Sequence, residues 1–80
     1  MKFFHRLFAT EVISIRDGQA TCTKGKRTRR ELADISEVAR DCGLESGELW
    51  IDKLGRVEFS KEVPAKAHQR FRNVLAVHSV

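Results

Sequence analysis

The sequence predicts an α+β fold in which two ββα units form a four-stranded antiparallel sheet with both helices on one face, preceded by a short N-terminal amphipathic helix. Three observations support this prediction. The pair Asp17-Gly18 stands between two alternating runs, Thr28 opens a helix signature, and the same order of signals returns in the second half. At 80 residues the chain is long enough for one domain. We therefore divide it into an N-terminal amphipathic segment, residues 1–10, and a single ββαββα domain, residues 11–80.

The first hairpin is expected between Glu11 and Lys24. Ile13 and Ile15 alternate with polar residues before the turn, and the residues after it alternate in the same way. Asp17-Gly18 is a strong hairpin signal because glycine adopts positive φ without a steric cost. The Ile and Thr residues on either side suit a half-buried strand.

The first helix is expected from Thr28 to about Cys42. Thr28 and Glu31 have the Thr-x-x-Glu spacing of a capping box, in which each side chain bonds a backbone N–H at the start of the helix. Gly43 follows, where a helix commonly ends in a left-handed residue. The apolar residues between these signals fall on one stripe: Leu32, Ile35, Ala39 and Cys42, with Val38 beside them.

The second half of the chain repeats the pattern. Leu49 and Ile51 belong to an alternating run, and Leu54-Gly55 supplies a turn before the next run. Pro64 is expected in the first turn of a helix over residues 64–75, where its missing N–H costs nothing. The apolar stripe of this helix is Ala67, Phe71, Val74 and Leu75.

Two groups of apolar residues lie outside the core predicted between the sheet and the two helices. Trp50 points to the sheet face opposite its neighbours, so it suits a second small cluster or an interface.

Three interpretations of the N-terminal segment stay open: packing on the domain or on a second copy, attachment to a membrane surface, and a frayed end. The surplus predicts a homodimer or a dedicated protein partner. The possible interface residues are Phe3, Phe4, Leu7, Phe8 and Trp50.

Charge alternates along the chain. Residues 1–30 carry eight Lys or Arg and two acids, residues 31–53 carry two and seven, and residues 54–80 carry five and two, so charges of +6, −5 and +3 give the net +4. Such a chain is expected to pair with its own opposite charges. The apolar runs are too short for a membrane span or a signal peptide. We expect a cytoplasmic protein, with peripheral contact at the inner face of the membrane through residues 1–9 as an alternative.

Short motifs between Glu11 and Leu75 also carry a family resemblance. They are Arg16-Asp17-Gly18, Lys24-Gly25, Gly55-Arg56-Val57-Glu58-Phe59-Ser60, Val63-Pro64 and Gln69-Arg70-Phe71-Arg72-Asn73-Val74-Leu75. In these the chain resembles a family of small bacterial proteins known as domain of unknown function 3634. Family members usually begin with a hydrophobic membrane anchor, whereas this chain has only a short amphipathic start, so anchoring does not transfer. The resemblance implies the fold and a bacterial source, and it implies no activity.

The candidate binding residues are cationic. A basic cluster lies between the first hairpin and the first helix: Lys24, Lys26, Arg27, Arg29 and Arg30. One interpretation is that these residues neutralise phosphates of a nucleic acid. The other is a solvated loop that balances the acidic helix, because no aromatic residues alternate with the cations for base stacking.

The closing helix supplies a second candidate, Arg70. By helical spacing Arg70 shares a face with Lys66 and Asn73. It is expected either to bind an anion or a partner, or to pair with an acidic residue of the first helix, namely Glu31, Asp34 or Glu37. Arg72 is alternatively expected to bridge to the sheet edge.

No catalytic, cofactor or metal site is expected. His5, His68 and His78 are scattered and lack a metal-binding spacing with the two cysteines, and no glycine-rich loop is present. The sequence therefore favours a non-enzymatic protein-interaction or oligomerisation module, with no small-molecule substrate, whose partner is a second copy or another protein. The alternative is a binder of nucleic acid or another anionic surface through the basic cluster.

Overall fold

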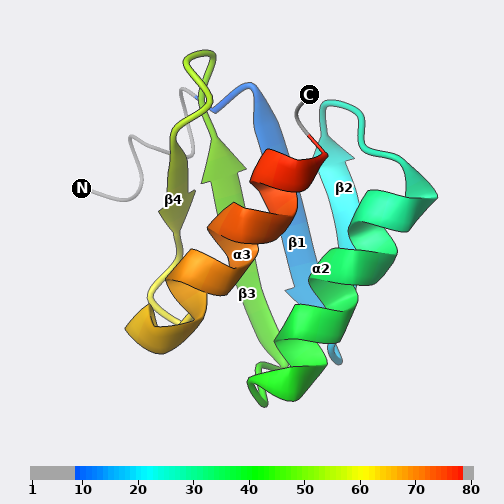
Figure 1. Cartoon of the computed structure of the whole chain (residues 1–80), viewed down its shortest axis with the longest axis vertical. Coiled ribbons are helices and arrows are strands. Elements are labelled where there is room, and N and C mark those ends of the chain that lie inside the picture. The colour runs from blue at the N-terminus through cyan, green and yellow to red at the C-terminus, as the bar shows by residue number, and fades with distance from the viewer. Residues whose placement is uncertain (1–8, 79–80) are drawn as a thin grey trace.

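The computed structural model describes residues 9–78, which form a four-stranded sheet covered by two helices (Figure 1). The α+β class and the ββαββα order are confirmed. The strands are β1 (Glu11–Arg16), β2 (Gln19–Lys24), β3 (Ser46–Ile51) and β4 (Val57–Phe59), and the helices are α2 (Arg29–Asp41) and α3 (Ala65–Val77). The expected N-terminal helix, with Phe3, Phe4, Leu7 and Phe8, lies outside the described residues.

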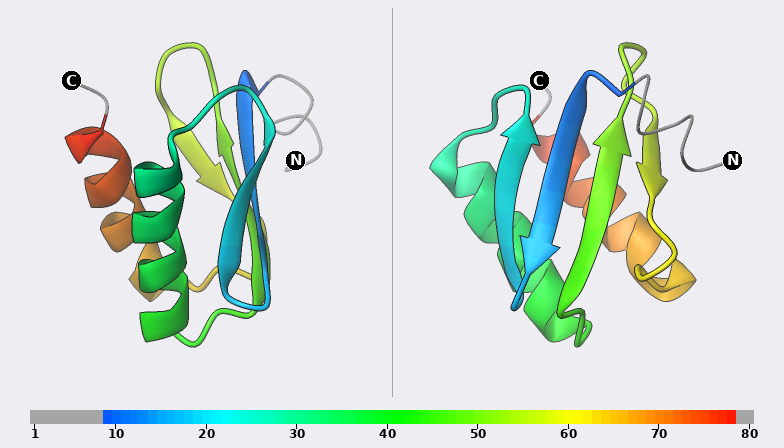
Figure 2. Two further views of the ribbon diagram at one scale, coloured as in Figure 1. Left: turned by 90° about the vertical axis from the view of Figure 1, so that its right-hand side faces the viewer. Right: turned by 180° about the vertical axis from the view of Figure 1, so that it is seen from behind.

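The sheet joins the two ββα units through their first strands. Its order is β2-β1-β3-β4, and every neighbouring pair is antiparallel. The central strands β1 and β3 pair over their whole length, from Glu11 opposite Ile51 to Arg16 opposite Ser46. Both helices cover the same face, as predicted (Figure 2). The second strand of each unit, β2 or β4, therefore forms an edge of the sheet.

The core lies between the sheet and the helices. Ile13 and Ile15 of β1 and Leu49 of β3 point toward the helices, and Ile35 of α2 and Phe71 of α3 meet them from the other side. All five side chains are fully buried. Strand alternation and helical periodicity together account for this burial. Three residues of the predicted stripes are only partly buried at the margin of the core: Leu32, Cys42 and Val74.

Different turns close the two hairpins. Asp17 (φ 52°) and Gly18 (φ 72°) both have positive φ, as in the two-residue turn that matches the twist of antiparallel strands. In the longer second turn, Asp52 Oδ1 accepts the backbone N–H groups of Leu54 and Arg56 at 2.9 Å each. The other oxygen, Oδ2, accepts Arg56 Nε at 2.8 Å. The carboxylate of Asp52 therefore organises the turn.

Helix α2 is capped at both ends. The predicted capping box is present: Thr28 Oγ1 accepts the Glu31 N–H at 3.1 Å, and Glu31 Oε1 accepts the Thr28 N–H at 3.3 Å. At the other end Gly43 has a φ of 69°. The Leu44 N–H donates to Ala39 O at 2.8 Å, and the Gly43 N–H donates to Arg40 O at 3.1 Å. These two bonds form a Schellman motif.

Helix α3 begins differently from the prediction. Pro64 precedes the helix, with an extended ψ of 146°, and provides no side-chain hydrogen bond to it. The helix therefore covers Ala65–Val77 instead of residues 64–75. The proline still sets the start, because its fixed φ of −69° suits the residue that leads into a helix.

The uncovered face of the sheet carries a second, smaller cluster of Ala9, Val12 and Trp50. Trp50 is 6% exposed, and its indole N–H donates to Glu48 Oε1 at 2.8 Å. The Thr10 N–H donates to Ile51 O at 2.8 Å, which attaches the chain before β1 to the same sheet. The predicted second cluster is thus present, whereas an interface at Trp50 remains a prediction.

The two helices run antiparallel to each other (Figure 1). Near one end of the pair Arg70 Nη2 donates to Asp41 Oδ2 at 3.1 Å, and near the other His78 Nε2 lies 2.8 Å from Asp34 Oδ2. Neither described helix is long and apolar enough to cross a membrane.

Candidate functional site

One cation of the basic cluster anchors the segment between β2 and α2. Arg27 Nη2 donates to Glu11 Oε1 at 2.6 Å, and Nη1 donates to Glu31 Oε2 at 2.7 Å. The Arg27 side chain is only 11% exposed. Because Glu31 also belongs to the capping box, Arg27 ties the start of β1 to the start of α2.

The charges of this contact stabilise each other. Burial lowers the pKa of Arg27, but the hydrogen bonds and charges of Glu11 and Glu31 outweigh burial and raise it. Burial likewise raises the pKa of Glu31, but the bonds from Arg27 and Thr28 and the charge of Arg27 outweigh this effect and lower it. Arg27 Nε is buried and has no hydrogen-bond partner among residues 9–78, which makes the contact less favourable. Arg27 is therefore a structural residue whose guanidinium is already engaged.

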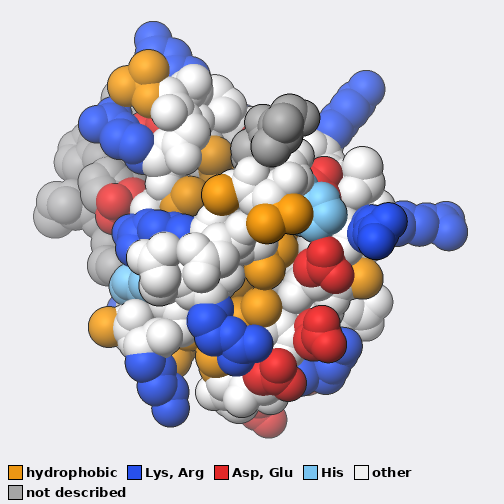
Figure 3. Space-filling view, viewed as in Figure 1, with side chains coloured by type: hydrophobic (Ala, Val, Ile, Leu, Met, Phe, Trp, Pro, Cys, Tyr) orange, Lys and Arg blue, Asp and Glu red, His pale blue; other side chains and the backbone are white. Residues whose placement is uncertain are grey.

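The other four cations of the cluster face solvent. Lys24, Lys26, Arg29 and Arg30 are exposed, and none of them forms an ion pair with a residue in the described part of the chain. Long basic side chains project from the side of the molecule where β2 leads into α2 (Figure 3). The structure therefore brings four of the five predicted cations to one exposed segment.

Arg70 pairs with an acid of α2, although not with one of the three expected. Its partner is Asp41, one helical turn beyond Glu37, and its Nη1 lies 3.7 Å from the Sγ of Cys42. The hydrogen bond from Arg70 to Asp41 is the main cause of a raised Arg70 pKa. Because both side chains are about half exposed, this pair contributes little to stability.

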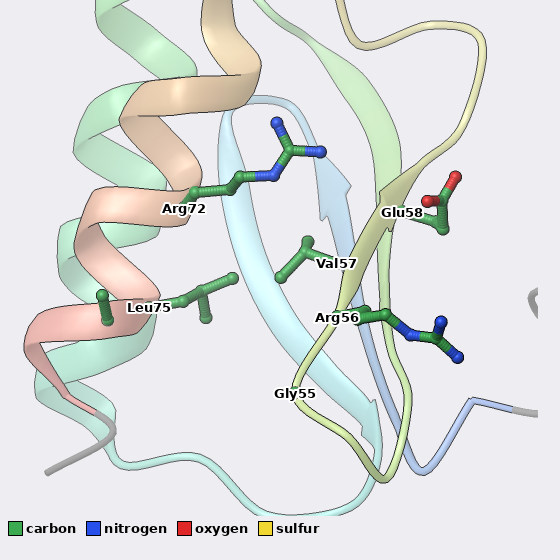
Figure 4. A pocket seen from close by; sticks show the side chains of 7 residues that line it. Gly55, Arg56, Val57, Glu58, Arg72 and Leu75 are labelled. Carbon is green, nitrogen blue, oxygen red and sulfur yellow. The ribbon is translucent and has the colours of Figure 1, made fainter.

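A groove lies between the edge strand β4 and helix α3. Its volume is about 560 Å³, within the range of known ligand pockets. Val57 and Leu75 face each other across it, and Arg72 points into it from α3, whereas Arg56 and Glu58 point to the other side of β4 (Figure 4). We call this feature the β4–α3 groove; its lining residues are Gly55, Arg56, Val57, Glu58, Arg72, Leu75 and Ala76.

The backbone of β4 contributes hydrogen-bonding groups beside this groove. Asp52 N–H donates to Arg56 O, and Ser60 N–H donates to Glu48 O, both at 3.0 Å, so residues 56 and 60 direct these groups toward β3. Backbone groups alternate in direction along an antiparallel strand. The N–H and C=O of Val57 therefore point away from β3. Since β4 is the last strand of the sheet, no described strand pairs with Val57 on that side.

Arg72 is the charged side chain that points into the groove. Its Cζ lies 5.2 Å from the centre of the Phe59 ring, which is a cation–π distance. The ring of His68 stacks on Phe59 with the two centroids 4.0 Å apart. Among the residues described here, none supplies a carboxylate to Arg72. Arg72 thus contacts the edge strand β4, as expected, and does so through the aromatic ring of Phe59.

The groove as a whole was not predictable from sequence patterns. The spacing of Val57 and Leu75 fits the buried faces of a strand and a helix, and the structure indeed places Leu75 in the core and Val57 against it, so neither residue marks a groove in the sequence. No local signal pointed to the groove, because it depends on the oblique course of α3 relative to β4 (Figure 1). Over residues 9–78 there is also no group of three or more His, Cys, Asp or Glu residues that could hold a metal ion.

Comparison with known proteins identifies the family. The profile of the family described as Protein of unknown function (DUF3634) matches residues 3–80, so the chain belongs to this family. No curated protein and no solved structure was found to match the chain. The comparison confirms the family resemblance of the sequence motifs and adds no activity.

Proposed function

We propose that this member of the family is a non-catalytic protein-interaction module that binds an extended segment of a partner protein in the β4–α3 groove. The observation that carries the proposal is that an edge strand and a mainly apolar groove lie side by side. Strand addition uses such a pair of features: the backbone of the edge strand supplies affinity, and the groove beside it supplies specificity. Val57 provides both, through its outward N–H and C=O and through its side chain.

The test is selection of octapeptides from a random library displayed as internal segments, followed by measurement of binding by fluorescence anisotropy. Ala76→Trp fills the groove from an exposed position of α3. Ala33→Trp makes the same change at an exposed position of α2, outside the groove, and is the matched control. We expect Ala76→Trp to weaken binding at least about tenfold, as loss of a central contact does, and Ala33→Trp to leave it unchanged.

Four results distinguish the proposal from the alternative occupants and interfaces. Failure to select any peptide, or binding that tolerates Ala76→Trp, contradicts it. A sedimentation coefficient that rises with concentration in the wild type but not in Ala76→Trp would show that the occupant is a second copy. Self-association unaffected by Ala76→Trp would instead favour the expected interface of Phe3, Phe4, Leu7, Phe8 and Trp50.

A second candidate function is binding of nucleic acid or another anionic surface by the basic cluster. It is favoured by the four exposed cations that have no ion-pair partner among residues 9–78. If all four neutralised phosphates of duplex DNA, the logarithm of the affinity would fall with the logarithm of salt concentration with a slope of about −3.6.

The double variant Arg29→Gln/Arg30→Gln should reduce this slope by about 1.8, since each cation contributes about 0.9. Lys61→Gln/Lys66→Gln removes two exposed cations elsewhere and is the matched control. Arg27 is left unchanged, because its replacement would disturb the fold. An equal effect of the two double variants would contradict this candidate.

A further inference from the structure

We infer, on the basis of the proposed function, that the segment bound in the β4–α3 groove carries a side-chain carboxylate two positions from an apolar residue, and that Arg72 binds this carboxylate. The groove combines two kinds of surface. Val57, Leu75 and Ala76 present aliphatic atoms, and Arg72 presents a cation. A complementary ligand therefore has one apolar group and one anionic group.

The position of Arg72 is defined before any ligand binds. Its guanidinium lies over the Phe59 ring, and that ring also stacks on His68 and lies against Phe71. The Phe59 side chain is buried. A guanidinium placed over a fixed ring loses less conformational freedom on binding than one extended into solvent. Arg72 is thus suited to form charge-assisted hydrogen bonds with a carboxylate.

The spacing within the groove is close to a two-residue step in an extended ligand. Arg72 and the pair Leu75 and Ala76 are separated by one turn of α3, which is about 5.4 Å along the helix. In an extended segment, residues i and i+2 point to the same side and lie about 6.6 Å apart. A segment that adds to β4 therefore directs every second side chain into the groove, one toward Arg72 and the next toward Leu75.

We assign the negative charge to an Asp or Glu side chain and not to the end of a chain. Terminal carboxylates are commonly captured by clusters of backbone N–H groups. At this site the positive group is a side chain, and the adjacent strand offers an outward N–H at Val57, which is needed for the ligand backbone. An internal segment of a partner meets both requirements.

The experiment compares the peptides selected above in an amidated form, which has no terminal carboxylate. The expected result is enrichment of Asp or Glu two positions from an apolar residue. Arg72→Gln should weaken binding about 10- to 100-fold, the value of a hydrogen bond to a charged group. Lys66→Gln, on an exposed position of the same helix, should change binding less than about twofold.

A change in the peptide tests the same contact without altering the protein. Replacing the enriched acid by its amide should weaken binding to the wild type as much as Arg72→Gln does, and should have little further effect on Arg72→Gln. Peptides that are blocked by Ala76→Trp but lack the acid, or that tolerate Arg72→Gln, overturn this inference and leave the proposed function intact. Binding that needs a free terminus and is lost on amidation also overturns it. If no peptide is selected, or binding tolerates Ala76→Trp, both fail.

Discussion

The two ββα units share an element order but differ in how completely they are closed. In the first unit β2 has six residues, a two-residue turn joins it to β1, and α2 has side-chain and backbone caps. In the second unit β4 has three residues, the turn is longer, and α3 has no side-chain cap. The first unit also contains the partly buried contact of Arg27 with Glu11 and Glu31.

This difference indicates a division of roles between the units. Helix α3 runs obliquely to β4 and moves away from it toward the middle of the sheet (Figure 1), and a groove lies between the start of β4 and the second half of α3. The first unit has a longer strand beneath its helix and a hydroxyl that joins the two: Ser36 Oγ accepts the Ala20 N–H at 2.8 Å. The first unit is thus the more completely closed of the two, and the groove that we propose as a binding site lies in the second.

The largest expected effect tests whether the units are energetically separate. Phe71→Ala in the second unit and Ile35→Ala in the first should each lower the free energy of unfolding by about 3–4 kcal/mol, because both side chains fill one shared core. Urea unfolding followed by circular dichroism and by Trp50 fluorescence should give coincident transitions. Two separate transitions would show that the units unfold independently.

The next effect concerns the buried contact of the first unit. Arg27→Ala should lower the free energy of unfolding by roughly 3 kcal/mol, because two carboxylates lose their partner in a partly buried site. Arg70→Ala, which breaks the exposed pair between the helices, should cost less than about 1 kcal/mol. Equal losses in chemical denaturation would mean that burial does not distinguish the two pairs.

Capping should also distinguish the units. Thr28→Ala removes a side-chain cap of α2 and should cost about 1 kcal/mol. Pro64→Ala removes no cap bond and should cost about 0.5 kcal/mol, chiefly because the unfolded chain gains freedom. Thermal unfolding of both variants measures the difference, and a larger loss for Pro64→Ala would contradict this account of the two helix starts.

The smallest effect is a change in acid stability. The pKa of Glu31 is lowered from 4.5 in the folded protein, so its ionised form stabilises the fold above pH 4.5, and this stabilisation is lost as pH falls below that value. The difference in free energy of unfolding between the wild type and Glu31→Gln should therefore shrink below pH 4.5. Asp52→Asn in the second unit should behave alike below pH 3.8, because hydrogen bonds from Arg56 lower the pKa of Asp52. If the difference in free energy of unfolding between the wild type and either variant did not vary with pH, the lowered pKa of that carboxyl group would be contradicted.

Local signals predicted most of the fold. The Asp17-Gly18 turn, the capping box and Gly43 each depend on neighbouring residues alone, and all three are present. Ion pairing between elements far apart in the sequence was predicted less well, since it depends on distances that only the folded chain defines. Arg70 thus reaches Asp41 and not an earlier acid of α2, and Arg27 turns inward to Glu11 although its neighbours in sequence face solvent.

The candidate site was the least predictable part, for a physical reason. A groove depends on how two elements pass each other in the folded chain, and no residue pattern records the course of a helix across a sheet. Arg72 could be expected near the sheet edge from its place on α3. Its position over Phe59, beside the outward backbone of Val57, follows only from the packing of α3 on β4.

The antiparallel sheet also defines how the molecule would respond to force. β1 begins and α3 ends at the same end of the molecule (Figure 1). Tension applied across these two ends acts on β1 from its first residue, and the bonds of β1 to β2 and β3 lie perpendicular to the strand. The strand would therefore be peeled away one hydrogen bond at a time instead of being sheared along its length. We therefore expect the domain to open at a lower force when it is pulled by these two ends than when β1 is pulled along its own length.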